Sequence, residues 1–431
     1  MSEIAKKSVE TLGTRVAMQL FAAAGGIAIA RVLSPTGKGE WTYAGTVLGF
    51  ALMATVGHNK AVLWQYARRR LPAASIIRVM VLVVIAMSAP IVLGLLLIGL
   101  FIPSQSSLLF VALALPFAIF SQSSVGIFLG DGNVRPINFA GMFPTVIATL
   151  IYVPLIIFAH GKLWIPLTVW SAAYVAGGIY TSFALRRYYA GEPAEDVKGL
   201  AKEQLTFGSQ ACLSSLMQYL DFRIDVFLVI YMLGSAALGI YSIGIAIGEF
   251  IWQLSSAMIY PALKDIGGTD EARAAEVTAK CMRHSFLLVF LAAVCVAVSV
   301  RTLVPLIYGP AFAYGAVVTI VLLPGIIAYS MMPALAAFFS QQLGQPRIPF
   351  YFSALSATLC AIVTALTLRH FGVIAAAAAT SISYTAAFSV AAIYFARLTG
   401  YGGRRLFIVS AADMRPYYSL LTSALSAVRG R

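Results

Sequence analysis

The sequence predicts an all-α polytopic membrane protein of about twelve transmembrane helices. Sixty per cent of its 431 residues are apolar, 11% are charged and the mean hydropathy is +0.87, a composition that excludes a soluble domain. A span of about 20 apolar residues crosses the hydrocarbon core of a bilayer, and helices satisfy the backbone polar groups at that depth. Twelve such stretches follow one another along the chain: 9–30, 41–63, 76–101, 107–129, 136–159, 164–185, 207–233, 238–262, 285–308, 314–340, 349–369 and 372–396.

Two segments that lie 200 positions apart share one layout and predict two related halves. Residues 31–50 and 231–250 each contain an apolar helix end, a short turn, an aromatic residue and a second apolar helix, and Gly39 matches Gly239. Two halves in one membrane protein enclose a cavity, and such cavities usually move a solute across the bilayer. We therefore expect two pseudo-symmetric six-helix bundles at 1–185 and 207–396, a cytoplasmic linker at 186–206, and a cytoplasmic, interfacial tail at 397–431.

Lys and Arg are distributed unevenly between the predicted loops, and this predicts the orientation. With a cytoplasmic N-terminus, 23 of the 30 basic residues lie on the cytoplasmic side, five lie on the other side, and two lie within spans. Cytoplasmic loops carry such an excess, so we expect both termini in the cytoplasm. The bias explains the net charge of +14 through topology and anionic membrane lipids, without nucleic acid as a partner.

Two motifs resemble a known family. Residues 30–41 read Ala-Arg-Val-Leu-Ser-Pro-Thr-Gly-Lys-Gly-Glu-Trp, and Asp225 precedes Leu233–Ser242. Together they resemble the paired signatures of polysaccharide-biosynthesis flippases, the Wzx-type O-antigen and exopolysaccharide flippases of the superfamily that also holds MATE drug exporters and the lipid II flippase. The resemblance implies a MATE-like fold in the bacterial inner membrane, a lipid-linked oligosaccharide as substrate, and a polysaccharide polymerase and glycosyltransferases as partners.

The first helix carries a charged residue on a face of small and polar residues. Thr11, Arg15, Gln19, Ala22 and Gly26 share this face by their three- and four-residue spacing. A charge at membrane depth usually faces a water-filled cavity or a partner, and a guanidinium group suits a phosphate. The alternative is that Arg15 snorkels to the cytoplasmic interface.

Three more basic residues are candidates for substrate binding. Lys60 follows His58 at the cytoplasmic end of the second helix, where it either contacts a diphosphate head group or only marks topology. Arg31 is expected with Lys38 at the outer rim, and Arg223 lies near the middle of the seventh helix. The complete set of predicted substrate-binding residues is Arg15, Gln19, Arg31, Lys60 and Arg223.

Acids are expected to couple transport to a cation gradient. Asp221 and Asp225 lie near the middle of 207–233, and Glu249 lies at the centre of the next helix. One interpretation makes an acid the site of a coupling proton or Na⁺. The other makes Asp221, Arg223 and Asp225 a structural ion-pair cluster, and Glu249 a neutral group that is hydrogen-bonded to neighbouring backbone.

The distribution of charge favours an anionic substrate. The centres of the first six helices contain no acid, whereas exporters of cationic drugs usually carry one there. We therefore expect a flippase that moves undecaprenyl-diphosphate-linked oligosaccharide repeat units to the outer leaflet by alternating access, coupled to a cation gradient. The alternatives are a MATE-like cation-coupled multidrug exporter and, less favoured, a membrane-embedded polysaccharide polymerase or glycosyltransferase.

No covalent chemistry is expected of this chain. Its sequence lacks a Ser/His/Asp arrangement, a metal-ligand spacing and a Walker-type phosphate loop, and its four cysteines have no paired spacing. We therefore expect a protein that is not an enzyme and that uses no cofactor or metal beyond the coupling H⁺ or Na⁺.

Overall fold

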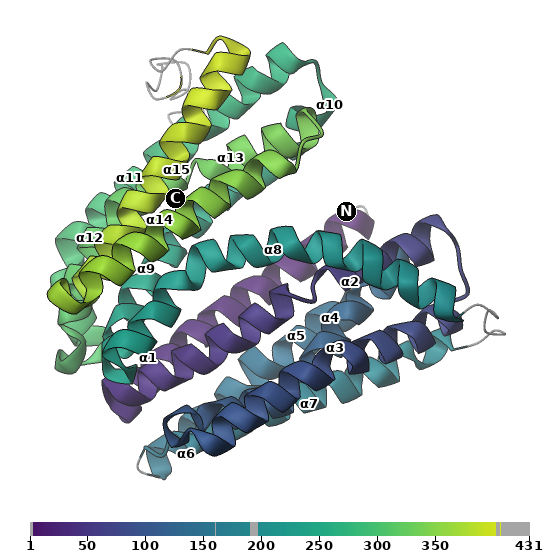
Figure 1. Ribbon diagram of the computed structural model, residues 1–431, viewed down its shortest axis with the longest axis horizontal. Helices are drawn as coiled ribbons and strands as arrows, with labels where there is room; N and C mark the ends of the chain where they lie inside the picture. The colour runs from purple at the N-terminus through teal and green to yellow at the C-terminus, as the bar shows by residue number, and fades with distance from the viewer. Residues whose placement is uncertain (1–2, 160, 190–196, 402–405, 407–431) are drawn as a thin grey trace, which may run out of the picture. The chain divides into compact units, whose positions relative to one another are not determined.

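The fold is the all-α polytopic membrane fold that the sequence predicts (Figure 1). The computed structural model describes residues 3–159, 161–189, 197–401 and 406, and these contain helices and no strand. The α-helices are α1 (Glu3–Met53), α2 (Gly57–Leu63), α3 (Ala73–Phe101), α4 (Ser107–Gly130), α5 (Arg135–Met142), α6 (Ala148–Phe158), α7 (Trp164–Leu185), α8 (Val197–Leu233), α9 (Ser235–Ile259), α10 (Leu263–Gly268), α11 (Glu271–Tyr308), α12 (Tyr314–Tyr329), α13 (Met332–Ala337), α14 (Arg347–Phe371) and α15 (Val373–Thr399).

Three π-helical segments interrupt or extend these helices: η1 (Trp64–Arg68), η3 (Phe143–Ile147) and η7 (Phe338–Gln342). The segment η3 joins α5 to α6. The expected interfacial tail at 397–431 lies mostly outside the described residues, and so do residues 190–196 of the expected linker.

Nine helical segments of the described residues are long and apolar enough to cross a membrane. The first of them, Gly13–Arg68, contains a non-helical corner at Ser34 (φ 63°, ψ 176°) and so holds two spans. Helices α7 and α8 are also long enough, but polar and aromatic residues lower the hydropathy of α7, and α8 carries charges near its middle. With the first segment counted as two and these helices added, the number agrees with the predicted twelve.

The chain divides into two compact units. The first unit comprises Met1–Ile240 and Ile307–Ala311, and the second comprises Tyr241–Leu306 and Phe312–Arg431. Helix α8 packs with the helices of the first unit in this grouping. The expected boundary at 186–206 concerns the two related halves of the sequence, and it stays a prediction.

The core of the first unit is formed by α3, α4, α7 and the second leg of α1. Ile76, Leu115 and Ile127 are fully buried there. A second cluster joins α6 to the first leg of α1, and in it the Trp41 ring lies tilted against the Tyr152 ring, with centroids 5.5 Å apart. Aromatic pairs add to the stabilisation that burial provides. Trp41, the aromatic residue of the first motif, therefore serves as a packing residue.

The second leg of α1 and α2 together lie along α8 (Figure 1). The Tyr219 hydroxyl donates a hydrogen bond of 2.9 Å to the Thr46 carbonyl, and the ring of Phe227 lies edge-on to that of Tyr43. Gly49 leaves room for the Tyr219 ring, since a Cβ there would lie 2.9 Å from the ring carbon Cζ.

The two repeated segments cross each other inside the first unit. A Cβ on Gly39 would overlap the Ser235 carbonyl oxygen, and a Cβ on Gly239 would overlap the Pro35 carbonyl oxygen. Residues 35 and 235, and 39 and 239, are each 200 positions apart, so the contact is reciprocal between the copies. We call it the Gly39–Gly239 crossing, and it requires glycine on both sides because the facing atoms are backbone.

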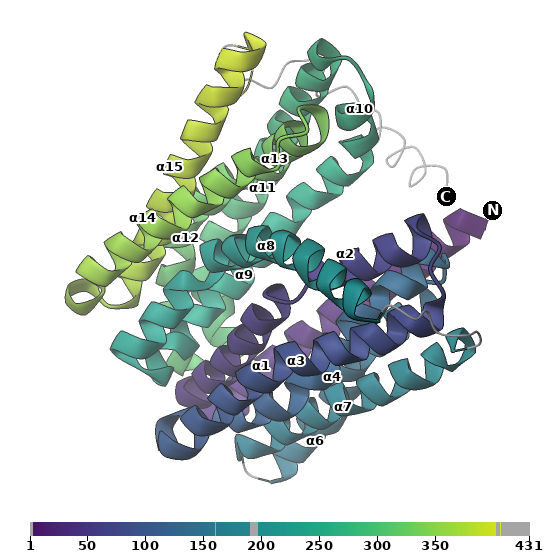
Figure 2. The same cartoon turned by 45° about the vertical axis from the view of Figure 1, so that its right-hand side comes forward.

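The second unit packs α12, α14 and α15 closely (Figure 2). The Ser381 hydroxyl donates to the Val321 carbonyl at 2.6 Å and accepts from the Gly325 amide at 3.3 Å. A Cβ on Gly325 would overlap the Ser381 backbone. Small residues therefore allow close helix contact, as in other membrane bundles.

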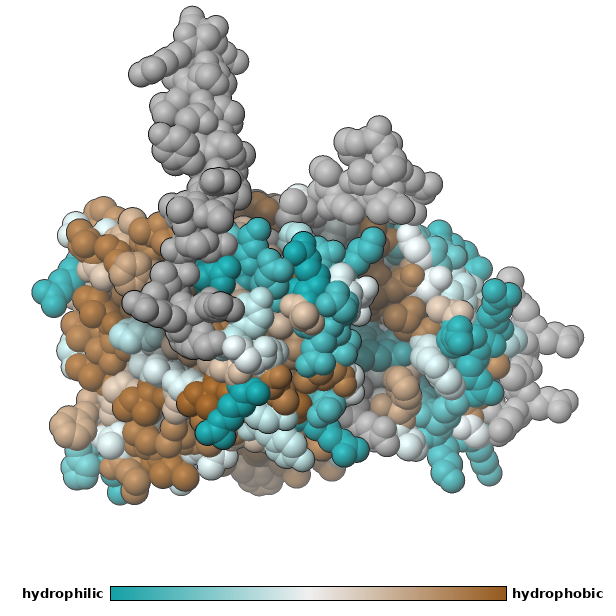
Figure 3. All heavy atoms as spheres, turned by 90° about the horizontal axis from the view of Figure 1, so that it is seen from above, coloured by the Kyte–Doolittle hydropathy of each residue, from teal (hydrophilic) through white to brown (hydrophobic). Residues whose placement is uncertain are grey.

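Apolar side chains cover wide areas of the face shown in Figure 3. Large exposed apolar side chains include Phe101 and Phe158, which are 79% and 80% exposed. A soluble monomer rarely exposes such patches, whereas the hydrocarbon of a bilayer covers them.

Candidate functional site

The predicted small and polar face of α1 begins at Thr11, close to two polar contacts with α5. Thr11 accepts a hydrogen bond of 3.2 Å from the Asn138 amide, and Glu10 pairs with Arg135 at 3.3 Å. Both partners lie on α5. One turn further along α1, Arg15 is exposed, so its guanidinium is accessible on the side that the spacing indicated.

Lys38 is a functional candidate that the sequence placed wrongly. It was expected at the outer rim, but its side chain is only 9% exposed. Its Nζ atom lies 3.5 Å from the position that a Cβ on Gly26 would occupy. Gly26 belongs to the predicted face of α1, so the corner at Ser34 turns the lysine back towards this face.

The sequence contains part of the reason for this placement, the Ser34-Pro35 pair. A corner at Ser34-Pro35 folds the second leg of α1 onto the first, and a lysine one turn after it reaches back along the first leg with its four-carbon stem. The interpretation of Lys38 as a rim residue assumed a loop of ordinary length between two helices, whereas the helix resumes directly after the corner.

The acids of α8 are buried in the first unit. Asp221 is 2% and Asp225 is 3% exposed, and one turn separates them. The Oδ1 atom of Asp225 accepts a hydrogen bond of 2.8 Å from the Val226 amide. Asp221, Arg223 and Asp225 all have further interaction partners within the protein, so each is held in place.

The other predicted site residues lie on α1, α2 and α9. Arg31 is exposed, and its Nε donates a hydrogen bond of 2.6 Å to the Ile307 carbonyl. Gln19 and Lys60 are exposed on α1 and α2, and Glu249 is half-buried on α9 in the second unit. The structure therefore brings Arg15, Gln19 and Lys38 to one hairpin, and Asp221 and Asp225 to one turn of α8.

One end of the first unit is held by a hydroxyl–carboxylate contact. Tyr188, in the turn after α7, donates a hydrogen bond of 2.6 Å to Asp131, and Arg187 lies 3.8 Å from the same carboxylate. Burial, followed by the bond to Asp131, raises the pKa of the Tyr188 hydroxyl. The tyrosine therefore stays protonated and keeps donating across the neutral range.

A cavity of about 350 Å³ lies between α1, α4, α5, η3 and α7 in the first unit. Its wall is mainly apolar, and the polar groups include Ser121 and Thr181, whose hydroxyls are 3.2 Å apart. This volume is too small for an oligosaccharide. It suits part of an apolar chain or a small amphipathic molecule.

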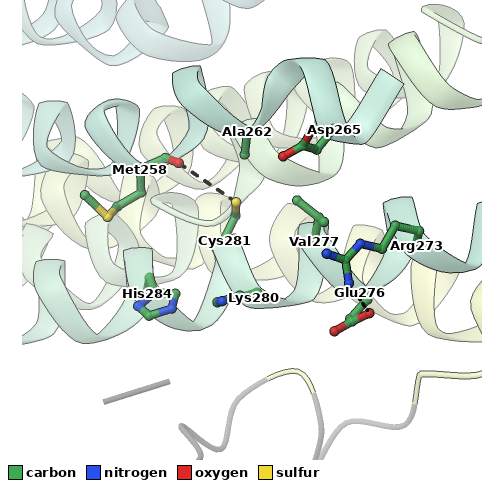
Figure 4. Close-up of a pocket in the computed structure, with 9 residues that line it drawn as sticks. All are labelled: Met258, Ala262, Asp265, Arg273, Glu276, Val277, Lys280, Cys281 and His284. Atoms are coloured by element: carbon green, nitrogen blue, oxygen red, sulfur yellow. Dashed lines mark hydrogen bonds and ion pairs between the residues drawn. The ribbon is translucent and has the colours of Figure 1, made fainter. Parts of the chain in front are cut away.

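A second cavity, of about 320 Å³, lies in the second unit where α9, α10 and α11 meet (Figure 4). The Cys281 thiol faces the Met258 carbonyl at 3.9 Å, and Arg273 pairs with Glu276 at 3.1 Å. The remaining lining residues are Ala262, Asp265, Val277, Lys280 and His284. Because charges of both signs line this cavity, its chemistry favours no single ligand charge.

No group of three or more His, Cys, Asp or Glu side chains is placed to hold a metal ion in the part of the chain that the structure describes.

Comparison with known proteins identifies a family and a fold. The model of the polysaccharide biosynthesis protein family matches residues 4–265. Comparison with curated proteins finds no sequence match. A multidrug resistance MATE family transporter of the MOP superfamily, solved in an inward-facing conformation, superposes with a TM-score of 0.69 at 14% identity, covering 89% of this chain and 94% of that one.

Two further solved structures are similar. Lipid II flippase MurJ in an inward closed conformation superposes with a TM-score of 0.70 at 11% identity, covering 91% of this chain and 88% of that one. A MATE family transporter in an outward-facing conformation gives 0.62 at 12% identity, with 91% and 94% covered. At these identities the likeness concerns the fold.

Proposed function

The chain belongs to the polysaccharide biosynthesis protein family, and from that premise we propose that it is a flippase for lipid-linked oligosaccharides. It moves an undecaprenyl-diphosphate-linked repeat unit from the cytoplasmic to the outer leaflet of the bacterial inner membrane by alternating access. Glycosyltransferases supply the substrate and a polymerase consumes it. The protein itself makes and breaks no covalent bond in this scheme.

The observation that carries the proposal is the cationic character of the α1 hairpin. Arg15 is exposed on the first leg, and Lys38 reaches back from the second leg to Gly26. The sequence contains no Asp or Glu between Thr11 and Gly39. The nearest carboxylates on either side of this stretch are Glu10, which pairs with Arg135, and Glu40. A stretch that carries Arg15 and Lys38 with no acid between them suits an external anion.

A diphosphate is the anion that fits this arrangement. Moving it unaided through hydrocarbon is prohibitive because its charges lose their hydration. A guanidinium donates two parallel hydrogen bonds to phosphate oxygens and an ammonium adds a point charge, and Gly26 places no side chain beside the Lys38 ammonium. The lipid tail stays in the bilayer while these groups replace water around the head group.

The test replaces each of the two cationic residues and measures flipping of a lipid-linked oligosaccharide. Arg15→Ala and Lys38→Met should each reduce flipping about tenfold to a hundredfold, which corresponds to the loss of one charge-assisted hydrogen bond, and Arg15→Lys should restore it only in part. The assay measures access of a membrane-impermeant lectin to a labelled lipid-linked oligosaccharide in proteoliposomes. Lys162→Ala, an exposed lysine just before α7, is the matched control. Full flipping by Arg15→Ala would return Arg15 to the snorkelling interpretation.

We further propose that an acid among Asp221, Asp225 and Glu249 couples transport to H⁺ or Na⁺, with Arg223 contacting the substrate anion. Asp225→Asn should then leave protein level and substrate binding intact, while accumulation against the gradient and its dependence on pH or Na⁺ disappear. If Asp225 instead only pairs with Arg223, the single change leaves a buried unpaired charge and costs about 3–5 kcal/mol of stability.

The double variant separates these two roles. In the structural case, Asp225→Asn combined with Arg223→Met should recover thermal stability and transport together. In the coupling case, the single change costs no stability, and gradient-dependent transport is absent from both the single and the double variant. Both are measured on the same proteoliposome preparations, with an imposed gradient.

A cation-coupled multidrug exporter is the second candidate, and the buried acids of α8 favour it because carboxylates also bind cationic drugs. Drug susceptibility of a deletion strain distinguishes the two. Loss of surface polysaccharide with unchanged drug susceptibility supports the flippase, and the opposite pattern supports the exporter.

A further inference from the structure

Helices α2 and α8 touch through their backbones within the first unit. A Cβ on Gly57 would overlap the Gly208 carbonyl oxygen, and a Cβ on Gly208 would lie 2.5 Å from Nδ1 of His58. The Gly57 amide donates a hydrogen bond of 3.2 Å to the Cys212 sulfur. We call this contact the α2–α8 seam, formed by Gly57, His58, Gln204, Gly208 and Cys212.

The seam buries polar groups that lack hydrogen bonds. His58 is 3% exposed and Gln204 is fully buried. Neither ring nitrogen of His58 and neither side-chain amide atom of Gln204 completes a hydrogen bond with any described residue, although the Gln204 main chain lies near the imidazole. Each such group costs about 1–3 kcal/mol, and water can satisfy all of them once the helices separate. Docking of the two helices therefore costs the hydration of these groups.

The charges around the seam decide what a proton on His58 would do. Glu203 on α8 is the nearby carboxylate, and it is engaged by Arg69 at 2.6 and 2.8 Å and by Gln65 at 3.3 Å. Lys60 on α2 has the same sign as an imidazolium. A protonated His58 in the docked seam therefore has no carboxylate of its own.

The remaining elements against α2 supply no counter-charge. Helix α4, which packs on α2 through Gly126, contains no titratable residue over its whole length. The segment η1 turns Tyr66 towards Tyr188 and leaves Arg68 exposed. On α8, the Cys212 thiol is the other titratable group in the seam, and a neutral thiol does not balance a cation.

From this geometry we propose that His58 is a proton-binding residue of the transport cycle: it takes up a proton when α8 separates from α2 and gives it up when the two helices dock. The role rests on the proposed flippase function, and it adds to the α8 acids a group that links protonation to movement of that helix. Because a proton that binds only the separated state must stabilise it, lowering the pH through the histidine range opens the seam.

Cys212 is a native reporter of this movement. With Cys281, Cys295 and Cys360 replaced by Ser, the rate of Cys212 alkylation is measured on folded full-length protein and divided at each pH by the rate in denatured protein. This ratio removes the fall of thiolate at low pH. Between about pH 8 and about pH 5.5, the ratio should rise roughly fivefold or more in the wild-type seam.

Three variants make the test specific. His58→Gln should abolish the rise, and His370→Gln, at the exposed end of α14, should keep it. In Arg69→Ala, Glu203 is released to pair with the imidazolium, so the docked state tolerates the proton and the rise shrinks even if the baseline increases. A flat ratio in the wild-type seam, or an unchanged rise in His58→Gln or Arg69→Ala, overturns the proposal.

The reporter is independent of the substrate. A seam that opens with acid in a protein that flips no lipid-linked oligosaccharide rejects the proposed function and leaves the proton-dependent opening of the seam standing. If the protein flips the lipid-linked oligosaccharide but Cys212 alkylation does not change with pH, the flippase function stands and the role of His58 is rejected.

Discussion

The contact of α8 and its continuation into α9 with α1 and α2 has two ends that are built differently. At one end, the Gly39–Gly239 crossing brings backbone against backbone, with carbonyl oxygens as the facing atoms. At the other, the α2–α8 seam also has two glycines in contact, but it encloses the polar groups of His58 and Gln204. The crossing depends on close steric fit alone. The seam also depends on close steric fit, but it buries polar groups that make no hydrogen bond.

This difference teaches how one helix pair can be both precise and separable. A glycine contact forms or fails according to sterics, so it fixes where the helices meet. Unpaired buried polar groups lower the free energy needed to separate them, because water satisfies those groups on opening. We expect substitutions at the crossing to act through overlap and substitutions at the seam to act through hydration.

The largest effect is expected at the crossing. Gly39→Ala or Gly239→Ala places a Cβ on a carbonyl oxygen that cannot rotate away, and should cost about 3 kcal/mol of stability together with most of the transport. Thermal unfolding in detergent and the lectin assay measure the two. Gly45→Ala is the matched control, since nothing lies within 4 Å of its Cβ. Equal thermal stability and equal transport in Gly39→Ala and Gly45→Ala would contradict a steric requirement for glycine at the crossing.

A smaller effect of opposite sign is expected at the seam. Gln204→Leu removes two buried polar atoms without partners and should stabilise the protein by about 1–2 kcal/mol, while Cys212 alkylation and transport both decrease. Gln218→Leu, on an exposed position of α8, should leave stability and alkylation nearly unchanged. Destabilisation by Gln204→Leu would mean that the amide is satisfied after all and that the two ends do not differ in this respect.

The smallest effect is expected at the corner that precedes the crossing. Ser34 has φ 63° and ψ 176°, a conformation that only glycine adopts without strain. Ser34→Gly should therefore stabilise the protein by about 1 kcal/mol or less, after the greater freedom of glycine in the unfolded chain is subtracted. Thr36→Gly, two residues on in ordinary helix, should destabilise by a similar amount. If both Ser34→Gly and Thr36→Gly lose stability, the backbone at Ser34 is not strained.

Much of the fold was predictable, because hydropathy over about 20 residues is a local property of the chain. The all-α membrane fold and the family are confirmed, and the described residues hold nine candidate membrane-spanning segments. The repeat was visible for a related reason: Gly39 and Gly239 are needed by the same kind of contact, so the layout around them recurs.

The candidate site was predictable only in part. The spacing placed Arg15 and Gln19 on one exposed face of α1, which the structure shows, while their role in binding stays a prediction, as do those of Arg31, Lys60, Arg223 and the three acids. Lys38 was assigned to the wrong environment, because burial of a long side chain depends on the corner that folds one leg of α1 onto the other.

The sequence alone therefore determined that this chain crosses a membrane as helices and carries Arg15 and Lys38 with no acid between them, since both are properties of residues close together along the chain. Only the tertiary structure decided that Lys38 reaches Gly26, that α8 packs along α1 and α2, and that His58 is buried against Gly208. These facts depend on which residues far apart in sequence come within a few ångströms, and hydropathy does not encode that choice.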